Sequence, residues 1–425
     1  MARYIEVYEY YKNLIISGQM EPEMKLPSIR KGANQLNISR TTMENAYMLL
    51  AAEGYIISHP QSGYYVTDMA KKKKENMETR LPEKKKTEKI LYDFASSNVD
   101  KESFKFDVWR RYMKSALRQD EKLLSYGEPQ GEMEFREVLA EYIRETRSVV
   151  CSPEQIVIGA GVQSLLHILC PIIKNRKVVS FHNPGYIQGC SIFEDYGFEL
   201  SEQISKNGVY YISPSQMSGE GGVMSITKRR ELLADAQEND YLIIEDDYNS
   251  EFKYFPKPTP SVQGLAGGKG VVYIGTFSKM LLPSIRMSYM VLPPELLPEY
   301  EGRKNNYNQT ASKAEQIALT QFIRDGHLAG QIRKSRKIHM AKSEELKKII
   351  LEVFGDRVKV KIGETGFHVR MKFQENINAK ILARKAEEQG IRVIPLSENG
   401  LMLTSANVPI EEYENAIFLM KKSFI

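Results

Sequence analysis

The stretch Val271–Lys279, VVYIGTFSK, constrains the fold of this chain more than any other. Its first four residues are apolar or aromatic and favour a strand, and Lys279 follows directly after a Thr-Phe-Ser tripeptide. Arg286 stands seven residues further on. A strand that ends in hydroxyls and an amine, with a cation nearby, indicates a lysine placed to form a Schiff base.

A second strand-like run, Tyr241–Ile244, leads into the acidic stretch Glu245–Tyr248. An amine, a carboxylate, hydroxyls and a cation are the groups that pyridoxal 5'-phosphate needs for its aldehyde, ring nitrogen and phosphate. Simpler explanations exist for each residue: the aspartates could end a strand or cap a helix, and Lys279 could be a surface lysine. The two runs together favour a pyridoxal 5'-phosphate site.

The composition is that of a soluble globular protein, with 42% hydrophobic and 27% charged residues in a chain of 425. No apolar run approaches the roughly 18 residues of a membrane span. Glutamates interrupt the first residues, so we expect no signal peptide. Cys151, Cys170 and Cys190 have no metal-ligand spacing, and we expect a reduced, cytoplasmic protein without a metal site.

Composition and patterning divide the chain into three parts. We expect a compact helical domain over residues 1–68, a solvated Lys/Glu-rich linker over residues 69–90, and a large α/β domain over residues 91–425. The linker holds nine Lys/Arg and four Glu, whereas residues 1–68 hold six Lys/Arg and seven Asp/Glu. In the last part, strand-like runs alternate with helical patterns, which predicts a mostly parallel sheet wrapped by helices.

Residues 1–68 predict a helix-turn-helix followed by a hairpin. Apolar residues at helical spacing cover Tyr4–Ile15, a second helix can start at Pro27-Ser28, and Ser39 is a good N-cap for a third. That third helix begins with short polar side chains and an arginine, which are suited to contact bases in the major groove of DNA. The alternative is a small protein-interaction domain, because the shape is unspecific and the net charge of the segment is −1.

Several segments resemble the winged-helix domain of GntR-family transcription regulators: Lys25–Arg30, Asn37–Thr42, Glu53–Tyr55 and Ser62–Val66. The resemblance implies that this domain binds double-stranded DNA. The residues that would contact DNA by position are Arg30, Ser39, Arg40, Thr41, Thr42 and Gly63. Gly32 departs from the family, which usually has leucine there, and we expect it to weaken its helix slightly.

Residues 91–425 resemble fold-type I aminotransferases, which have a large domain with a mostly parallel sheet and a small C-terminal α+β domain. The matching motifs, in order, are Tyr126–Gly131, Gly159–Gln163, Asn183–Tyr186, Asp246–Tyr248 and Thr276–Lys279. A GntR-like domain followed by an aminotransferase-like domain is the domain order of the MocR-type subfamily. Glu245–Phe252 and Leu282–Arg286 are similar to that subfamily in particular.

The resemblance implies a role for each matched residue. Lys279 would form the Schiff base, and Asp246 would pair with the pyridinium nitrogen. Tyr248 would hydrogen-bond the phenolic oxygen, and Tyr186 would lie against the ring. The residues that would hold the phosphate are Gly161, Val162, Gln163, Thr276, Arg286 and, from the neighbouring subunit of a homodimer, Tyr126. Taken singly, Gly161 could be a turn glycine and Tyr186 a core residue.

Two segments depart from the aminotransferase pattern. Pro214–Gly221 lacks the histidine, aromatic residue and second proline of the subfamily, and Ser218 stands where an asparagine would contact the phenolic oxygen. Met402 stands where an arginine would hold the substrate carboxylate. Arg370 and Arg392 are possible substitutes.

These departures favour a sensor over a catalyst, because proton transfer requires a substrate that is held at a fixed angle. We expect a transcriptional regulator that binds a DNA operator as a homodimer and senses an amino compound, or the cofactor itself, at Lys279. Two alternatives stay open. The chain could be a working aminotransferase with an added DNA-binding domain. It could also be a protein-binding module that uses the aminotransferase-like domain as a scaffold.

Overall fold

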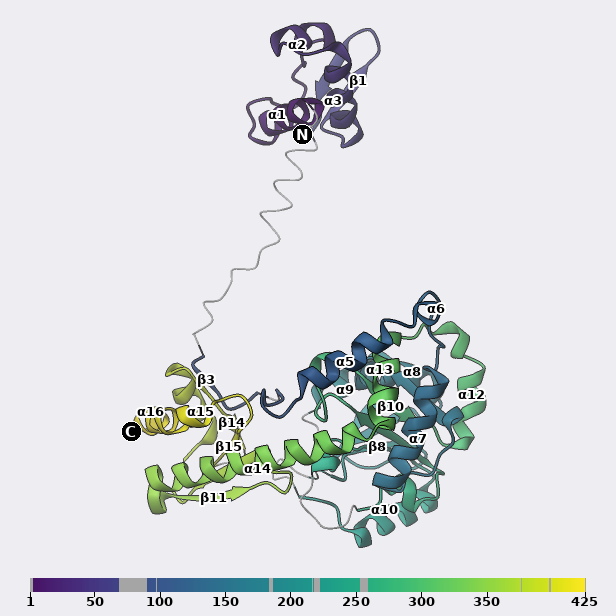
Figure 1. Cartoon of the computed structure of the whole chain (residues 1–425), viewed down its shortest axis with the longest axis vertical. Helices are drawn as coiled ribbons and strands as arrows, with labels where there is room; N and C mark the ends of the chain where they lie inside the picture. The colour runs from purple at the N-terminus through teal and green to yellow at the C-terminus, as the bar shows by residue number, and fades with distance from the viewer. Residues whose placement is uncertain are drawn as a thin grey trace. The chain divides into compact units, whose positions relative to one another are not determined.

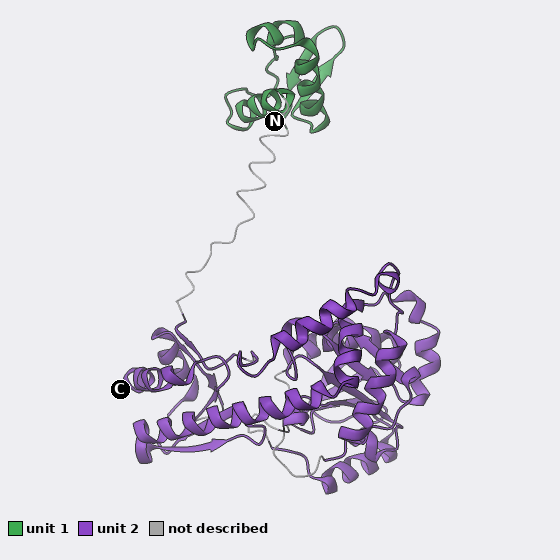
Figure 2. Cartoon of the chain, in the orientation of Figure 1, with its two compact units in different colours: residues 1–87 green, residues 88–425 purple. Residues whose placement is uncertain are grey.

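The computed structural model describes residues 3–68, 90–96, 98–182, 186–215, 217, 222–252, 259–375, 377–396 and 399–424. The chain forms two compact units, residues 1–87 and residues 88–425 (Figure 2). The expected linker lies outside the described residues, except for residue 90. Among the described helices, none is long and apolar enough to cross a membrane.

The smaller unit is a three-helix bundle with a hairpin. Its elements are α1 (Arg3–Ile16), α2 (Ile29–Gln35), α3 (Arg40–Ala52), β1 (Ile56–His59) and β2 (Gly63–Val66). The Ser28 hydroxyl accepts the N–H of Lys31 at 3.3 Å, and the Ser39 hydroxyl accepts the N–H of Thr42 at 3.0 Å. These caps start α2 and α3 at the positions that the sequence predicts, and the winged helix-turn-helix prediction is confirmed.

Gly32 has a packing role that its helix propensity alone does not suggest. It is buried in α2, and a Cβ at this position would lie 2.2 Å from Cε of Met43 on α3. Met43 and Tyr47 are fully buried between the helices, and the Tyr47 hydroxyl donates to the carbonyl of Pro27 at 2.9 Å. The glycine therefore lets α2 approach α3 closely, which offsets its cost to the helix.

The larger unit alternates strands and helices. Its strands are β3 (Tyr92–Asp93), β4 (Ile156–Gly159), β5 (Val178–Phe181), β6 (Glu199–Ser201), β7 (Val209–Ile212), β8 (Leu242–Asp246), β9 (Val271–Thr276), β10 (Ser288–Val291), β11 (Val358–Ile362), β12 (His368–Phe373), β13 (Ile391–Arg392), β14 (Ile394–Pro395) and β15 (Gly400–Thr404). Its helices are α5 (Phe106–Ala116), α6 (Asp120–Leu123), α7 (Met133–Arg147), α8 (Val162–Ile172), α9 (Ile187–Asp195), α10 (Ile226–Asn239), α11 (Val262–Leu265), α12 (Leu297–Glu301), α13 (Lys313–Arg324), α14 (His327–Phe354), α15 (Ala379–Glu388) and α16 (Tyr413–Phe424).

A seven-stranded sheet in the order β4-β10-β9-β8-β7-β5-β6 forms the centre of the large lobe. Neighbouring strands are parallel except at β10, which runs antiparallel to both of its neighbours. One face packs apolar side chains against α5, α7 and α13, and the other packs against α8, α9 and α12. This confirms the predicted α/β architecture, since parallel strands are buried on both faces.

A four-stranded antiparallel sheet in the order β11-β12-β15-β14 forms the small lobe. Helices α15 and α16 and the C-terminal half of α14 cover one face of it. The long helix α14 runs from the large lobe to the small one (Figure 1). Strand β3 pairs with β13, so the first described part of this unit belongs to the small lobe.

Candidate functional site

The residues singled out by the sequence meet at one edge of the seven-stranded sheet. Ser288, the first residue of β10, pairs with Gly159 at the end of β4 and with Thr276 at the end of β9. Asp246 pairs with Ile274 one strand further along. The carboxyl ends of the parallel strands therefore lie together, and in open α/β sheets this edge is where ligands bind.

Lys279 follows β9 at this edge. Its side chain is only 8% exposed, and its Nζ lies 5.2 Å from the centroid of the Phe367 ring. Within the described part of the chain its amine forms no hydrogen bond or ion pair. Burial lowers the pKa of Lys279 to about 8, because a buried ammonium lacks hydration. The neutral, nucleophilic form of this amine is therefore more accessible near neutral pH than that of an ordinary lysine.

Asp246 ends β8 close to two tyrosines. The hydroxyl of Tyr211 donates to its Oδ2 at 2.7 Å, and the Tyr186 ring lies 5.7 Å from the Tyr211 ring. Burial raises the pKa of Asp246 to about 6, against the hydrogen bond from Tyr211, which lowers it. Burial also raises the pKa of Tyr186 and of Tyr248 to about 12. A cation beside Asp246 would favour its ionised form.

Arg286 lies against the start of α8. The backbone of Gly161 has a φ of 93°, and a Cβ there would lie 2.5 Å from Nη2 of Arg286. Val162 and Gln163 open the helix, whose first turn has no side-chain cap within the described residues. Backbone N–H groups at a helix N-terminus and a guanidinium in the same place suit an anion such as a phosphate.

The other predicted site residues have different surroundings. The Thr276 hydroxyl accepts a hydrogen bond from the Ser288 hydroxyl at 2.9 Å, at the strand end beside Lys279. The side chain of Tyr126 is fully exposed. Ser218 and Asn183–Gly185 lie outside the described residues.

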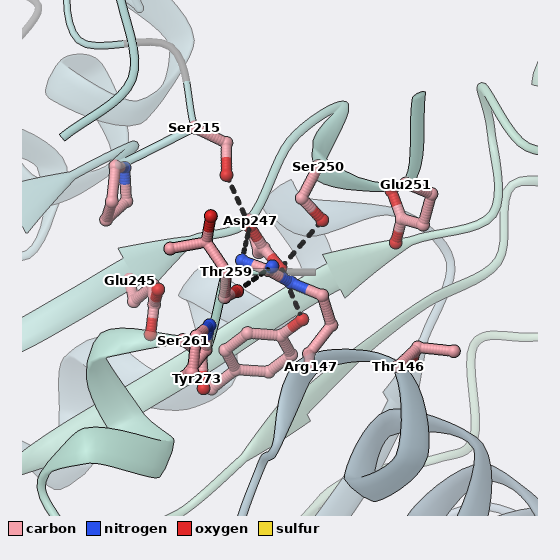
Figure 3. A network of polar contacts seen from close by, with 12 residues as sticks. Thr146, Arg147, Ser215, Glu245, Asp247, Ser250, Glu251, Thr259, Ser261 and Tyr273 are labelled. Atoms are coloured by element: carbon pink, nitrogen blue, oxygen red, sulfur yellow. Dashed lines mark hydrogen bonds and ion pairs between the residues drawn. The ribbon is translucent and has the colours of Figure 1, made fainter. Parts of the chain in front are cut away.

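Asp247 belongs to a buried network that the sequence did not reveal (Figure 3). Arg147 donates to it through Nε at 2.6 Å and Nη2 at 3.0 Å. It also accepts hydrogen bonds from the hydroxyls of Ser215, Ser250 and Tyr273. Burial alone would raise the pKa of Asp247, but the Arg147 charge and these hydrogen bonds hold it well below its usual range. The network fixes the chain directly after β8, and with it the position of Asp246.

Residues of strand β12 in the small lobe lie near Lys279. Strand register places Arg370 on β12 directly opposite Met402 on β15, so the two side chains share one face of the sheet. His368 precedes Arg370 by two residues and points to the same face. Burial, together with the nearby charges of Lys279 and Arg370, lowers the pKa of His368 to about 4. The register thus brings a guanidinium to the side of Met402.

His339 on α14 also lies near Lys279, against the Phe367 ring. It is 1% exposed, and neither ring nitrogen has a hydrogen-bond partner among the described residues. Its ring lies 4.1 Å from the Phe367 ring, and burial lowers its pKa to about 3. Buried polar atoms without partners are rare, so this imidazole is suited to contact a ligand or water. A lone histidine within a long helix gave no signal of this in the sequence.

Arg392, the other substitute considered for Met402, is placed differently. It lies on β13, outside the four-stranded sheet, and its Nε is 3.2 Å from Oε1 of Glu387. Its Nη1 is 3.8 Å from Asp93. Of the two arginines, only Arg370 shares a sheet face with Met402.

The candidate DNA-binding residues lie on α2, α3 and the hairpin. Arg30, Arg40 and Thr41 are exposed. The hydroxyls of Ser39 and Thr42 lie 2.7 Å apart and take part in the cap of α3.

At the hairpin, Gly63 begins β2 with a φ of 111°. The Lys25 amine lies over the Tyr65 ring, 5.7 Å from its centroid. It adds a cation beside the wing that was not among the predicted DNA contacts.

Comparison with known proteins identifies both units. The family model for bacterial regulatory proteins of the gntR family matches residues 3–66, and the model for aminotransferase class I and II matches residues 89–417. The uncharacterized HTH-type transcriptional regulator YdeL of Bacillus subtilis (strain 168) is 37% identical over 414 residues, which cover 93% of this chain and 89% of that protein.

Two further relatives agree with this assignment. The probable rhizopine catabolism regulatory protein MocR of Rhizobium meliloti is 26% identical over 459 residues, covering 99% of this chain and 93% of that protein. The crystal structure of LysN, an alpha-aminoadipate aminotransferase from Thermus thermophilus, has a TM-score of 0.67 at 22% identity, covering 79% of this chain and 92% of that chain. The chain therefore belongs to the MocR-type transcriptional regulators of the GntR family, in which a winged helix-turn-helix unit is fused to a unit with the fold of class I and II aminotransferases.

Proposed function

We propose that this regulator binds pyridoxal 5'-phosphate at Lys279 and senses an amino compound there, in the cytoplasm and as a homodimer. The observation that carries the proposal is the buried Lys279 amine at the same sheet edge as Asp246 and Arg286. The structure of LysN contains a phosphopyridoxyl derivative of leucine, which supports the same ligand class here.

The residues at the edge fit this cofactor. Gly161 leaves room for the Arg286 guanidinium at the start of α8, because a Cβ at this position would collide with it. Asp246 would accept from the ring nitrogen and Tyr248 would donate to the phenolic oxygen. Tyr186 would lie against the ring. The residues that would hold the phosphate are Val162, Gln163, Thr276, Arg286 and the Tyr126 of a second subunit.

When bound, the cofactor would supply an aldehyde that exchanges one amine for another. The neutral form of Lys279 is the nucleophile for its attachment. Asp246 would hold a proton on the ring nitrogen, and the Tyr211 hydrogen bond would fix the carboxylate in place. An incoming amine would compete with Lys279. The displaced lysine would change its contact with the Phe367 ring.

Arg370→Gln is expected to weaken binding of an amino acid effector. A charged hydrogen bond contributes about 1.5–3 kcal/mol, so the dissociation constant should rise roughly tenfold to a hundredfold. The measurement is an absorbance titration of the cofactor-loaded protein with amino acids and with the corresponding decarboxylated amines. The amines should bind both proteins alike, because they lack the carboxylate.

Arg392→Gln is the matched control, because it removes the same charge from the same lobe. It should leave the titrations unchanged. Equal loss in the two variants, or no loss with Arg370→Gln, would remove Arg370 from the effector site.

The main alternative, a working aminotransferase, gains some support from the place of Arg370. Met402 cannot pair with a carboxylate, but a guanidinium directly opposite it could hold one. The same titration separates the two functions. Sustained conversion of amino donor and keto acid, at roughly 1 per second or faster, would indicate an enzyme. A spectral change without turnover supports a sensor.

Arg40→Ala is expected to weaken binding to a duplex selected from a random pool by the wild-type protein. The loss should be about 1–3 kcal/mol if the guanidinium contacts a base edge. Binding to unselected duplex should change much less. Arg30→Ala is the comparison, since a phosphate contact would weaken both duplexes equally. Unchanged affinity for the selected duplex in Arg40→Ala would mean that the start of α3 does not read the sequence.

A further inference from the structure

The four-stranded sheet of the small lobe has one apolar and one basic face. Val358, Val369 and Met371 point to the apolar face, where they pack with α14, α15 and α16. Because side chains alternate along a strand, the residues between them point the other way. That side carries Lys359 and Lys361 on β11 and Arg370 and Lys372 on β12. We call the three lysines, Lys359, Lys361 and Lys372, the basic face; Arg370 on the same side is the arginine opposite Met402.

The register of β11 and β12 opposes like charges. Lys359 pairs with Lys372, and Lys361 pairs with Arg370. Cations directly opposite each other destabilise an antiparallel strand pair. The three lysines are exposed, and none of them forms an ion pair within the described ranges. Stability of the sheet does not account for this arrangement.

The acidic residues described near the two strands do not neutralise the three lysines of the basic face. Glu375, which follows β12, pairs with Arg357 at 3.2 Å. Glu364 is exposed in the loop that joins the strands and makes no ion pair with a described residue. Three exposed lysines without described counter-charges match a polyanion in charge.

The polyanion most accessible to this chain is DNA. Residues 1–68, which match the DNA-binding family, hold six Lys/Arg and seven Asp/Glu, so their net charge does not attract phosphates. Affinity for DNA depends strongly on phosphate neutralisation by cations. The segment of residues 69–89 joins the units, and about 20 residues span at most about 70 Å. Once the smaller unit is bound, the basic face is therefore held at high effective concentration near the same duplex.

We propose that the basic face binds the phosphate backbone of the DNA that the smaller unit reads. This goes beyond the cofactor site and does not depend on it. The contact adds affinity without adding sequence information, because phosphates are the same in every sequence.

The test compares two triple variants of the full chain. Lys359→Gln, Lys361→Gln and Lys372→Gln remove the exposed cations of the basic face. Lys380→Gln, Lys385→Gln and Lys422→Gln remove three exposed lysines from α15 and α16, which cover the opposite face.

Both variants and the wild type are titrated with a random-sequence duplex of about 60 base pairs across a salt series. The basic-face variant should lose affinity by about tenfold to a hundredfold at 0.1 M salt, and its slope of log K against log salt should be smaller by about 2–3. The α15/α16 variant should match the wild type. The thermal unfolding midpoint of the basic-face variant should be unchanged or higher, because opposed cations are removed.

Equal losses in the two variants would overturn the proposal, because net charge alone would then explain the binding. No loss in either variant would also overturn it and would point to an acidic protein as the partner of this face. A lower unfolding midpoint for the basic-face variant would show that these lysines stabilise the sheet, which contradicts the account.

Discussion

Lys279→Ala is expected to remove the visible imine absorbance that the wild-type protein shows after incubation with pyridoxal 5'-phosphate. The side chain is the buried amine at the sheet edge, and within the described residues no ion pair competes for it. Fold and basal DNA affinity should change little, because the smaller unit has its own core. The measurements are an absorbance spectrum and a DNA titration of the same preparation.

Two controls sharpen this test. Lys279→Arg keeps a cation at this position but cannot form the imine, so it should lose the absorbance as well. Lys304→Ala removes a lysine that pairs with Glu301 on the surface, and it should keep the wild-type spectrum. Persistence of the absorbance in Lys279→Ala would assign the attachment to another lysine.

Arg147→Met is expected to destabilise the larger unit by about 3–5 kcal/mol, because it leaves the buried Asp247 carboxylate without its counter-charge. Both side chains are almost fully buried, and the guanidinium holds the carboxylate through two hydrogen bonds. Urea unfolding followed by Trp109 fluorescence measures the effect. Trp109 is the single tryptophan of the chain and lies in the core of the larger unit, so it reports on that unit alone.

Arg303→Met provides the comparison for this pair. Arg303 and Glu299 form an ion pair at 2.9 Å on the surface of α12 and the turn after it, and exposed pairs of this kind contribute little to stability. Similar shifts of the urea midpoint in the two variants would show that the Arg147–Asp247 network does not stabilise the larger unit as proposed.

The strands that carry the candidate site were predictable because each is a short apolar run between polar segments. Val271–Ile274 and Tyr241–Ile244 are such runs, and the structure places Val271–Ile274 in β9 and Leu242–Ile244 in the neighbouring strand β8. Ser39 was recognisable as a cap because a serine before an apolar period has a local role. These features depend on neighbours in sequence, which a single chain displays.

The different surroundings of Asp246 and Asp247 were not predictable. Adjacent residues at the end of a strand point to opposite sides, and alternation alone does not say which side faces a ligand; the choice of Asp246 came from the family resemblance. Asp246 meets Tyr211, and Asp247 meets Arg147, a residue 100 positions away. Contacts of such sequence separation arise from the topology of the sheet.

The relation of Arg370 to Met402 likewise required the structure. A shift of one residue in the pairing of β12 and β15 would put the two side chains on opposite faces. The sequence could offer Arg370 and Arg392 only as equal candidates. The observed register and the ion pairs of Arg392 distinguish them.

Reduction with borohydride tests the central claim most directly. Wild-type protein incubated with pyridoxal 5'-phosphate, reduced and digested should yield one modified peptide, with the mass of the reduced cofactor on Lys279. An unmodified Lys279 peptide from protein that remains colourless would contradict the account.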